Sequence, residues 1–296
     1  QFNQNKRKRE NKMVIDAQTV KDLRDKTGLP MMKCKAALTE TNGDAEKAIE
    51  LLRKEGLKAS DKRSERENNE GLICTLSKNN KQALVELKCE TDFVGKNQDF
   101  KNFAQDLCEQ VIANGAENVA KQKYIRNPAI TVEQAIQELT LKIGEKLSIG
   151  TVKLDQGLCG AYVHHNGKQA ATIRLSGDAK LSENDSVKEL LKGICQHIVF
   201  TAPKCKSSTD LPADLIEQEK AKFKEESVEE LKGKPANIQE KILESKLKKF
   251  FSESCLLEQK YIKDDKKSIS EVVKNVSKEI NSNLSVDDFS LVVVGK

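Results

Sequence analysis

The first part of the chain carries apolar residues at the three- and four-residue spacing of short amphipathic helices. The first helix is expected to stop at Gly28 and Pro30, and the polar residues 42–44 are expected to turn the chain before the last helix. The apolar sets are Val20, Leu23 and Thr27; Met32 to Leu38; and Ala45, Ala48, Ile49 and Leu52. We therefore predict a three-helix bundle over residues 14–56, followed by a charged linker or an exposed helix over residues 57–70.

Apolar and polar residues then alternate, which is the pattern of strands with one buried face. The alternating positions are Leu72, Cys74 and Leu76 before a polar turn, and Ala83, Val85, Leu87 and Cys89 after it. Two apolar stripes at helical spacing follow, over 100–112 and 132–143, and then a strand near 147–154. A hairpin, two helices and a strand predict an α+β subdomain over residues 71–155.

The same order of elements then returns, with shared letters. Gly71-Leu72 leads to Lys81-Gln82-Ala83 in the first copy, and Gly157-Leu158 leads to Lys168-Gln169-Ala170 in the second. A helical stripe over 187–199 follows, and later come a strand near Tyr261, a helix over 269–276 and a closing strand over 289–294. We predict a second, related α+β subdomain with an antiparallel sheet over residues 156–296.

An insertion interrupts the second copy at about residues 213–252. Two highly charged helices flank Gly233-Lys234-Pro235 and share only a narrow apolar seam. This pattern predicts a helical hairpin, or coiled-coil arm, that serves for contacts.

Charge changes this picture mainly at the N-terminus. Residues 1–12 carry five basic and one acidic side chain, which accounts for +4 of the net charge of +5. The body is therefore close to neutral, which argues against direct nucleic-acid binding. The chain starts with Gln1, and the basic tail over residues 1–13 favours the remnant of a processed import signal. We therefore expect the mitochondrial matrix as the compartment, with another organelle or the bacterial cytoplasm as alternatives. No apolar run of about 18 residues is present, so no membrane span is expected.

Residues that carry chemistry are sparse. The eight cysteines include no CxxC pair, so we interpret them as reduced core thiols. A zinc site built on Cys195, His197 and Cys205 with the adjacent His164 and His165 is a weak alternative. Phosphate-loop, dinucleotide, hydrolase and zinc-protease motifs are all missing from the sequence. We therefore expect no cofactor, no metal and no covalent catalysis.

One segment, KCETDFVGKNQDF, places an apolar Phe93-Val94 pair among charges where a strand meets a helix. In a purely structural interpretation, Phe93 or Val94 folds back onto the helix and Asp92 caps a turn. In a functional interpretation, the pair contacts a partner. The second copy has Ser176-Gly177-Asp178-Ala179 at the equivalent corner, so the turn does not require a phenylalanine, which favours the functional interpretation.

These residues resemble the elongation factor Ts family over nearly the whole chain. VKDLRDKTGLPMMKCKAALTETNGDAEKAIELLRKEG resembles the family's N-terminal UBA-like domain, and CETDFVGKNQDF resembles its core signature. GKP in the arm and LEQKYIKDDKKSISEVV also match, whereas Pro30 departs from the small residue of the family's methionine-bearing turn.

The resemblance implies a guanine nucleotide exchange factor that acts on elongation factor Tu in its GDP-bound and nucleotide-free states. It implies that Asp92 and Phe93, between Thr91 and Val94, insert near the magnesium and phosphates of the GTPase. It also implies partner contacts for Arg24, Met31 and Met32 and, through a looser match, for Tyr162 and His164.

Two other classes stay open. A chain with this fold could serve as a non-catalytic structural subunit of a larger organellar assembly, although the intact Asp92-Phe93 pair argues against that function. A UBA-type binder of ubiquitin-like or nascent chains would explain residues 14–56 but would leave the duplicated core unused.

Overall fold

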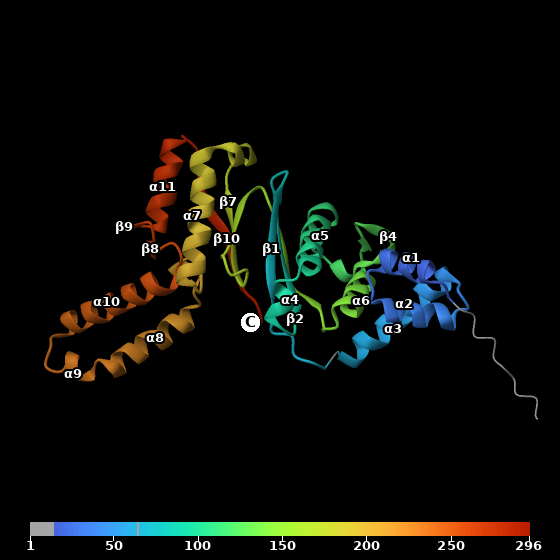
Figure 1. Ribbon diagram of the computed structural model, residues 1–296. Helices are drawn as coiled ribbons and strands as arrows, with labels where there is room; N and C mark the ends of the chain where they lie inside the picture. Colours follow the sequence, from blue (N-terminus) through green and yellow to red (C-terminus); the bar gives the residue numbers. More distant parts are fainter. Residues whose placement is uncertain (1–14, 64) are drawn as a thin grey trace, which may run out of the picture. The chain divides into compact units, whose positions relative to one another are not determined.

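The structure, a computed structural model, describes residues 15–63 and 65–296. The predicted basic tail over 1–13 lies outside the described residues. The chain divides into two compact units: the first comprises the residues up to 71 with 88–101 and 120–148, and the second comprises 72–87, 102–119 and 149–296. Helices and small sheets together make an α+β protein, as predicted (Figure 1).

Three helices open the first unit: α1 (Ala17–Thr27), α2 (Met31–Glu40) and α3 (Ala45–Arg63). The Asp16 side chain caps α1 by accepting a hydrogen bond from the backbone N–H of Thr19 at 2.8 Å. Gly28 ends that helix in the left-handed region, at φ 66°. The predicted helices are confirmed, and α3 continues past Gly56, so residues 57–63 are helical.

The apolar faces of these helices share one core. Its buried members are Val20, Leu23, Leu29, Cys34, Ala37, Leu38, Ala48, Leu52 and Leu141. Leu141 belongs to a later helix, α6 (Val132–Ile143), so the three N-terminal helices are packed against α6 within the same unit. This packing brings the turn between α1 and α2 to the end of α6.

The predicted first hairpin is confirmed as β1 (Glu70–Lys78) and β2 (Lys81–Cys89), and β5 (Ser148–Gln156) completes a sheet of order β1-β2-β5. Asn79 and Asn80 form the two-residue turn, both with positive φ, as the tight turns of hairpins require. Between β2 and β5 lie α4 (Asp92–Gly95), α5 (Gln98–Asn114), η1 (Val119–Lys121), β3 (Lys123–Tyr124), β4 (Asn127–Thr131) and α6.

The second sheet repeats this order as β10-β7-β6, with both pairs antiparallel. Its strands are β6 (Leu158–Val163), β7 (Gln169–Ser176) and β10 (Ser285–Val293). The elements between β7 and β10, apart from the insertion, are η2 (Ala179–Glu183), α7 (Asp185–Thr201), η3 (Ser208–Asp210), β8 (Lys260–Tyr261), β9 (Asp264–Ser268) and α11 (Ile269–Glu279). The duplication predicted from the letters is thus a duplication of topology.

The repeat extends further than the sequence pattern indicated. Each copy contains a small two-stranded ribbon, β3-β4 or β8-β9, that leads directly into a helix. Both helices begin with a capping box, Thr131 with Gln134 in the first copy and Ser268 with Glu271 in the second. Of these strands, only the short one near Tyr261 was predicted, and it is confirmed as β8. The pairing into ribbons was not predicted, because β3 and β8 have only two residues each.

The insertion is a helical hairpin, as predicted, made of α8 (Ala213–Glu226), the short α9 (Val228–Leu231) and α10 (Ala236–Ser254) (Figure 1). We call these three helices the arm. The Phe223 and Phe250 rings meet edge to face across its seam, with centroids 6.3 Å apart. The additional helix α9 lies just before the Gly233-Lys234-Pro235 turn, which was expected to join the two long helices directly.

Candidate functional site

The predicted corner follows β2 as the single helical turn α4. Phe93 is 78% exposed, whereas the neighbouring Val94 is only 8% exposed. Because successive residues of a helical turn point about 100° apart, only one of the two apolar side chains faces inward. Val94 is therefore the residue that folds back, and the Phe93 ring is left at the surface.

One carboxylate holds the start of this corner in place. Glu145 accepts hydrogen bonds from the backbone N–H groups of Glu90 and Thr91, at 3.1 and 3.0 Å, and from the Thr91 hydroxyl at 2.6 Å. Glu90 in turn accepts from the backbone N–H of Lys146 at 2.6 Å. The corner and the segment after α6 therefore hold each other through two charged side chains, and we call this arrangement the Glu145 clamp.

The buried thiol next to the clamp is neutral. Burial, followed by the nearby charges of Glu145 and Glu70, raises the pKa of Cys89 to about 12. The Cys89 thiol donates to the carbonyl oxygen of Thr91 at 3.1 Å. It thus adds a weak bond to the base of the corner.

The contacts at the outer end of the corner are exposed to solvent. Asp92 and Lys96 form an ion pair of 2.7 Å, and both side chains are well exposed. The Lys96 ammonium also lies 5.7 Å from the centroid of the Phe93 ring, within the range of a cation–π contact. Lys96 therefore contacts both of the residues that the sequence singled out.

A groove opens beside the Phe93 ring, with a volume of about 500 Å³. Its lining comes from the turn between α1 and α2, from the corner and from the end of α6: Arg24, Gly28, Leu29, Pro30, Phe93, Val94, Asn97, Asp99, Lys142 and Ile143. An ion pair of 2.7 Å joins Lys142 to Asp99. Gly28 has a φ of 66°, which favours glycine, and a Cβ there would lie 3.1 Å from the end of the flexible Lys142 side chain.

The groove unites some of the predicted site residues and leaves others apart. Arg24, Phe93 and Val94 line it together. Met31 and Met32 are 45% and 74% exposed in the first turn of α2, directly after Pro30, but they do not line the groove. Exposed methionines are adaptable contact residues, which suits a protein-binding surface.

Tyr162 and His164 belong to the other unit. They alternate on β6 and continue just beyond it, so they share a face, and the Tyr162 hydroxyl lies 3.4 Å from Nδ1 of His164. Their rings meet edge to face with centroids 6.2 Å apart. The predicted partner-binding residues therefore form two separate clusters, one in each unit.

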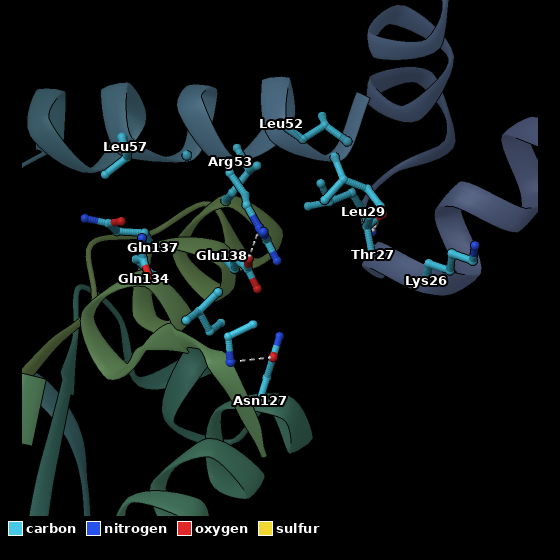
Figure 2. A pocket seen from close by; sticks show the side chains of 15 residues that line it. Lys26, Thr27, Leu29, Leu52, Arg53, Leu57, Asn127, Gln134, Gln137 and Glu138 are labelled. Atoms are coloured by element: carbon cyan, nitrogen blue, oxygen red, sulfur yellow. Dashed lines mark hydrogen bonds and ion pairs between the residues drawn. The ribbon is translucent and has the colours of Figure 1, made fainter. Parts of the chain in front are cut away.

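A second cavity, of about 320 Å³, lies between α3 and the β4-α6 segment (Figure 2). Leu29, Leu52 and Leu57 supply part of its apolar lining, and the ion pair of Arg53 with Glu138, at 2.7 Å, spans it. This cavity was not predicted. The ion pair links α3 to α6.

Among residues 15–63 and 65–296, no group of three or more His, Cys, Asp or Glu side chains is arranged to hold a metal ion. The weak zinc interpretation is therefore wrong for these residues. His197 instead contacts the Gln259 side chain at 2.9 Å and accepts from the backbone N–H of Ile262 at 3.3 Å. No helix within the described part of the chain is long and apolar enough to cross a membrane.

An exposed aromatic ring beside an open groove is a feature typical of protein-binding sites. Comparison with known proteins identifies the family. Residues 90–296 match the family described as Elongation factor TS. The protein named Elongation factor Ts of Lawsonia intracellularis is 39% identical over 295 residues, covering 96% of this chain and 100% of the relative. That of Chloroherpeton thalassium is 39% identical over 284 residues, covering 93% and 96%. The chain belongs to the elongation factor Ts family.

Proposed function

We propose that this chain promotes GDP release from elongation factor Tu by inserting the Phe93 corner near the magnesium and phosphate site of the GTPase. Nucleotide exchange in translation elongation is the function that family membership implies. The observation that carries the residue-level proposal is the 78% exposure of Phe93 on a corner whose base is fixed by the Glu145 clamp.

A wedge needs a rigid base, because a flexible one would bend instead of displacing the partner. The carboxylate of Glu145 accepts three hydrogen bonds from residues 90 and 91, and a bond to a charged group contributes about 1.5–3 kcal/mol. The backbone that enters α4 is thus held firmly. This supports a corner that keeps its shape when it contacts a GTPase.

A wedge also needs a tip that is free to leave its own contacts. The exposed Asp92–Lys96 ion pair contributes roughly 0–1 kcal/mol, and an exposed cation–π contact contributes about 0.5–1 kcal/mol. The partner can therefore replace both contacts at small cost. Once Lys96 turns away, the Phe93 ring can fill a gap in the partner, with the exposed Asp92 carboxylate beside it.

GDP in a GTPase is held by magnesium and by backbone donors around its phosphates, so displacement of those elements weakens a charge-assisted site. The reaction makes and breaks no covalent bond, so the chain acts as an exchange factor and not as an enzyme of covalent chemistry. By linkage, the factor by which the chain lowers GDP affinity is the factor by which GDP lowers the affinity of the chain. Both complexes therefore stay reversible.

Contacts outside the corner divide between the units. We assign Arg24, Met31 and Met32 to one surface of the GTPase and Tyr162 and His164 to another. Their exposure or partial exposure supports this assignment. We further propose that residues 14–56 form a UBA-like domain, that residues 71–155 and 156–296 form the two subdomains, and that the arm is a coiled coil. We also propose that the chain makes no direct contact with nucleic acid.

The compartment is a separate proposal. The sequence of residues 1–13 supports import into the mitochondrial matrix, whereas the relatives compared above are bacterial proteins. Import of the radiolabelled precursor into isolated mitochondria, with loss of a leader, would support the matrix. A precursor that stays outside and unprocessed would contradict it.

The exchange function is tested by mixing the chain with elongation factor Tu that carries a fluorescent GDP, in an excess of unlabelled GDP. We expect release to accelerate by orders of magnitude over the spontaneous rate, with the observed rate rising with the concentration of the chain. Release at the spontaneous rate would contradict the proposal and would favour a purely structural subunit.

A further inference from the structure

Two cysteines face each other where the arm joins the second unit. Cys205 follows α7 and precedes α8, and Cys255 follows α10 directly. The two residues form an isolated parallel β-bridge. The backbone N–H of Leu256 donates to the carbonyl oxygen of Cys205 at 2.9 Å, and that of Cys205 donates to Ser254 at 3.4 Å. These bonds close the root of the arm.

The bridge brings the thiols into contact. The two Sγ atoms are 3.0 Å apart. Paired strands lie about 4.8 Å apart, so bridge partners have Cα atoms at about that spacing. A disulfide accepts Cα separations of about 4.4–6.8 Å, so the spacing of this bridge is compatible with a disulfide.

The two thiols differ in access. Cys205 is half-buried, whereas Cys255 is buried. Burial, with a further contribution from the hydrogen bond to Cys205, raises the pKa of the Cys255 thiol well above its usual value. Cys205 is therefore the thiol that a reagent from solvent meets first, and Cys255 is a partner that is reached only from Cys205.

We propose that Cys205 and Cys255 are a redox modification site, at which a low-molecular-weight disulfide such as glutathione disulfide forms a reversible bond across the root of the arm. The Cys205 thiolate attacks one sulfur of the reagent and releases one thiolate. The Cys255 thiolate then attacks the Sγ of Cys205 and releases the second. Two cysteine thiols lose two electrons and two protons, and one disulfide becomes two thiols.

The bond would have a mechanical consequence. It would close a loop over residues 206–254 that contains all three helices of the arm. Closing a loop of that length restricts the unfolded chain and fixes the root of the folded arm. In a reducing compartment such a pair would be mostly reduced, so the bond would form only when the thiol–disulfide balance shifts.

The test uses the full chain, equilibrated with reduced and oxidised glutathione in graded ratios, then alkylated and digested with trypsin. We expect the dipeptide Cys205-Lys206 to appear joined to the peptide 250–260, lighter by two hydrogen atoms than the reduced pair. Restoring reduced glutathione should reverse the link. Cys205 that stays open to alkylation at every ratio, or a link to another cysteine, would overturn the proposal.

Two variants and one physical measurement complete the test. Cys205→Ser should abolish the link, whereas Cys74→Ser, which removes another half-buried thiol of the same unit, should leave it unchanged. The thermal midpoint of the wild-type chain should rise on oxidation, and that of Cys205→Ser should not. A lower midpoint on oxidation would overturn the proposal. Should Cys205→Ser fail to fold, the peptide map of the wild-type chain still decides. None of these measurements involves the GTPase, so the outcome is independent of the proposed exchange function.

Discussion

Replacing Phe93 by alanine separates the two explanations of the corner. The Phe93 side chain is 78% exposed, so its loss removes little buried surface from the free chain. Substitutions at such positions usually change the free energy of unfolding by less than about 0.5 kcal/mol. We therefore expect Phe93→Ala to fold normally, with an unchanged urea midpoint.

The effect on exchange should be much larger. Full burial of a phenylalanine is worth about 1.5–3 kcal/mol, and 78% of the side chain is still available for burial against the GTPase, which leaves about 1.2–2.3 kcal/mol. Each 1.36 kcal/mol is a factor of ten in rate. If that energy is used in the transition state for GDP release, Phe93→Ala should slow catalysed release by about 7- to 50-fold.

The assay is stopped-flow release of fluorescent GDP from elongation factor Tu at sub-saturating concentrations of the chain. Phe200 provides the matched control, because it is 79% exposed and lies in the other unit, at the end of α7. We expect Phe200→Ala to retain the wild-type rate. If Phe93→Ala released GDP at the wild-type rate, or if both variants lost the same fraction of that rate, the proposed role of Phe93 as a wedge would be refuted. A lowered urea midpoint for Phe93→Ala would show that the ring supports the fold.

Three further outcomes follow from the same structure. Glu145→Gln removes the charge that holds residues 90 and 91, so the free energy of unfolding should fall by about 1–3 kcal/mol in urea titrations and exchange should slow; an unchanged midpoint would mean that the clamp is not needed. Lys96→Ala should change the free energy of unfolding by less than about 1 kcal/mol but should change the rate of GDP release, whereas Lys96→Arg should release GDP at the wild-type rate. A wild-type rate for Lys96→Ala as well would mean that the contacts of Lys96 with Asp92 and Phe93 have no role. Burial lowers the pKa of His197, so as the pH falls the unfolded chain binds a proton before the folded chain does. The free energy of unfolding should therefore fall as the pH drops through about 6.5. His197→Gln should weaken this pH dependence in thermal scans at pH 7.5 and 5.5.

Much of this fold could be predicted from local patterns. Helical spacing indicated α1 to α3, α5 to α7 and α11, alternation indicated the first hairpin, and the repeated letters indicated the second. Those signals lie within one element and depend on which side chains face a core. Other features have a weaker signal or none. Residues 57–63 are too polar to show a stripe, so a linker and an exposed helix were both left open, and β3, with two residues, is too short to show alternation.

The position of the candidate site along the sequence could be predicted, but the contacts and orientations of its side chains could not. The missing phenylalanine in the second copy indicated that the corner at Phe93 serves a purpose beyond the turn, yet no periodicity could decide which member of the Phe93-Val94 pair faces inward. Glu145 was missed because it lies more than fifty residues along the chain from its hydrogen-bond partners. Lys96 lies four residues after Asp92, the spacing of a helical ion pair, so it could have been found if the corner had been expected to be helical.

The energetic difference between the two ends of the corner determines what gives way on binding. At its base, the charged Glu145 carboxylate accepts three hydrogen bonds, each worth about 1.5–3 kcal/mol. At its tip, Asp92, Lys96 and Phe93 share exposed contacts worth at most about 1 kcal/mol each. A GTPase that competes for these groups therefore displaces Lys96 before it bends the backbone. In the proposed contact, this order would let the chain approach as a stable structure and still present the Phe93 ring to the partner. In the reverse arrangement, the tip would be firmly paired and the base loose. The same binding energy would then deform the exchange factor instead of the nucleotide site.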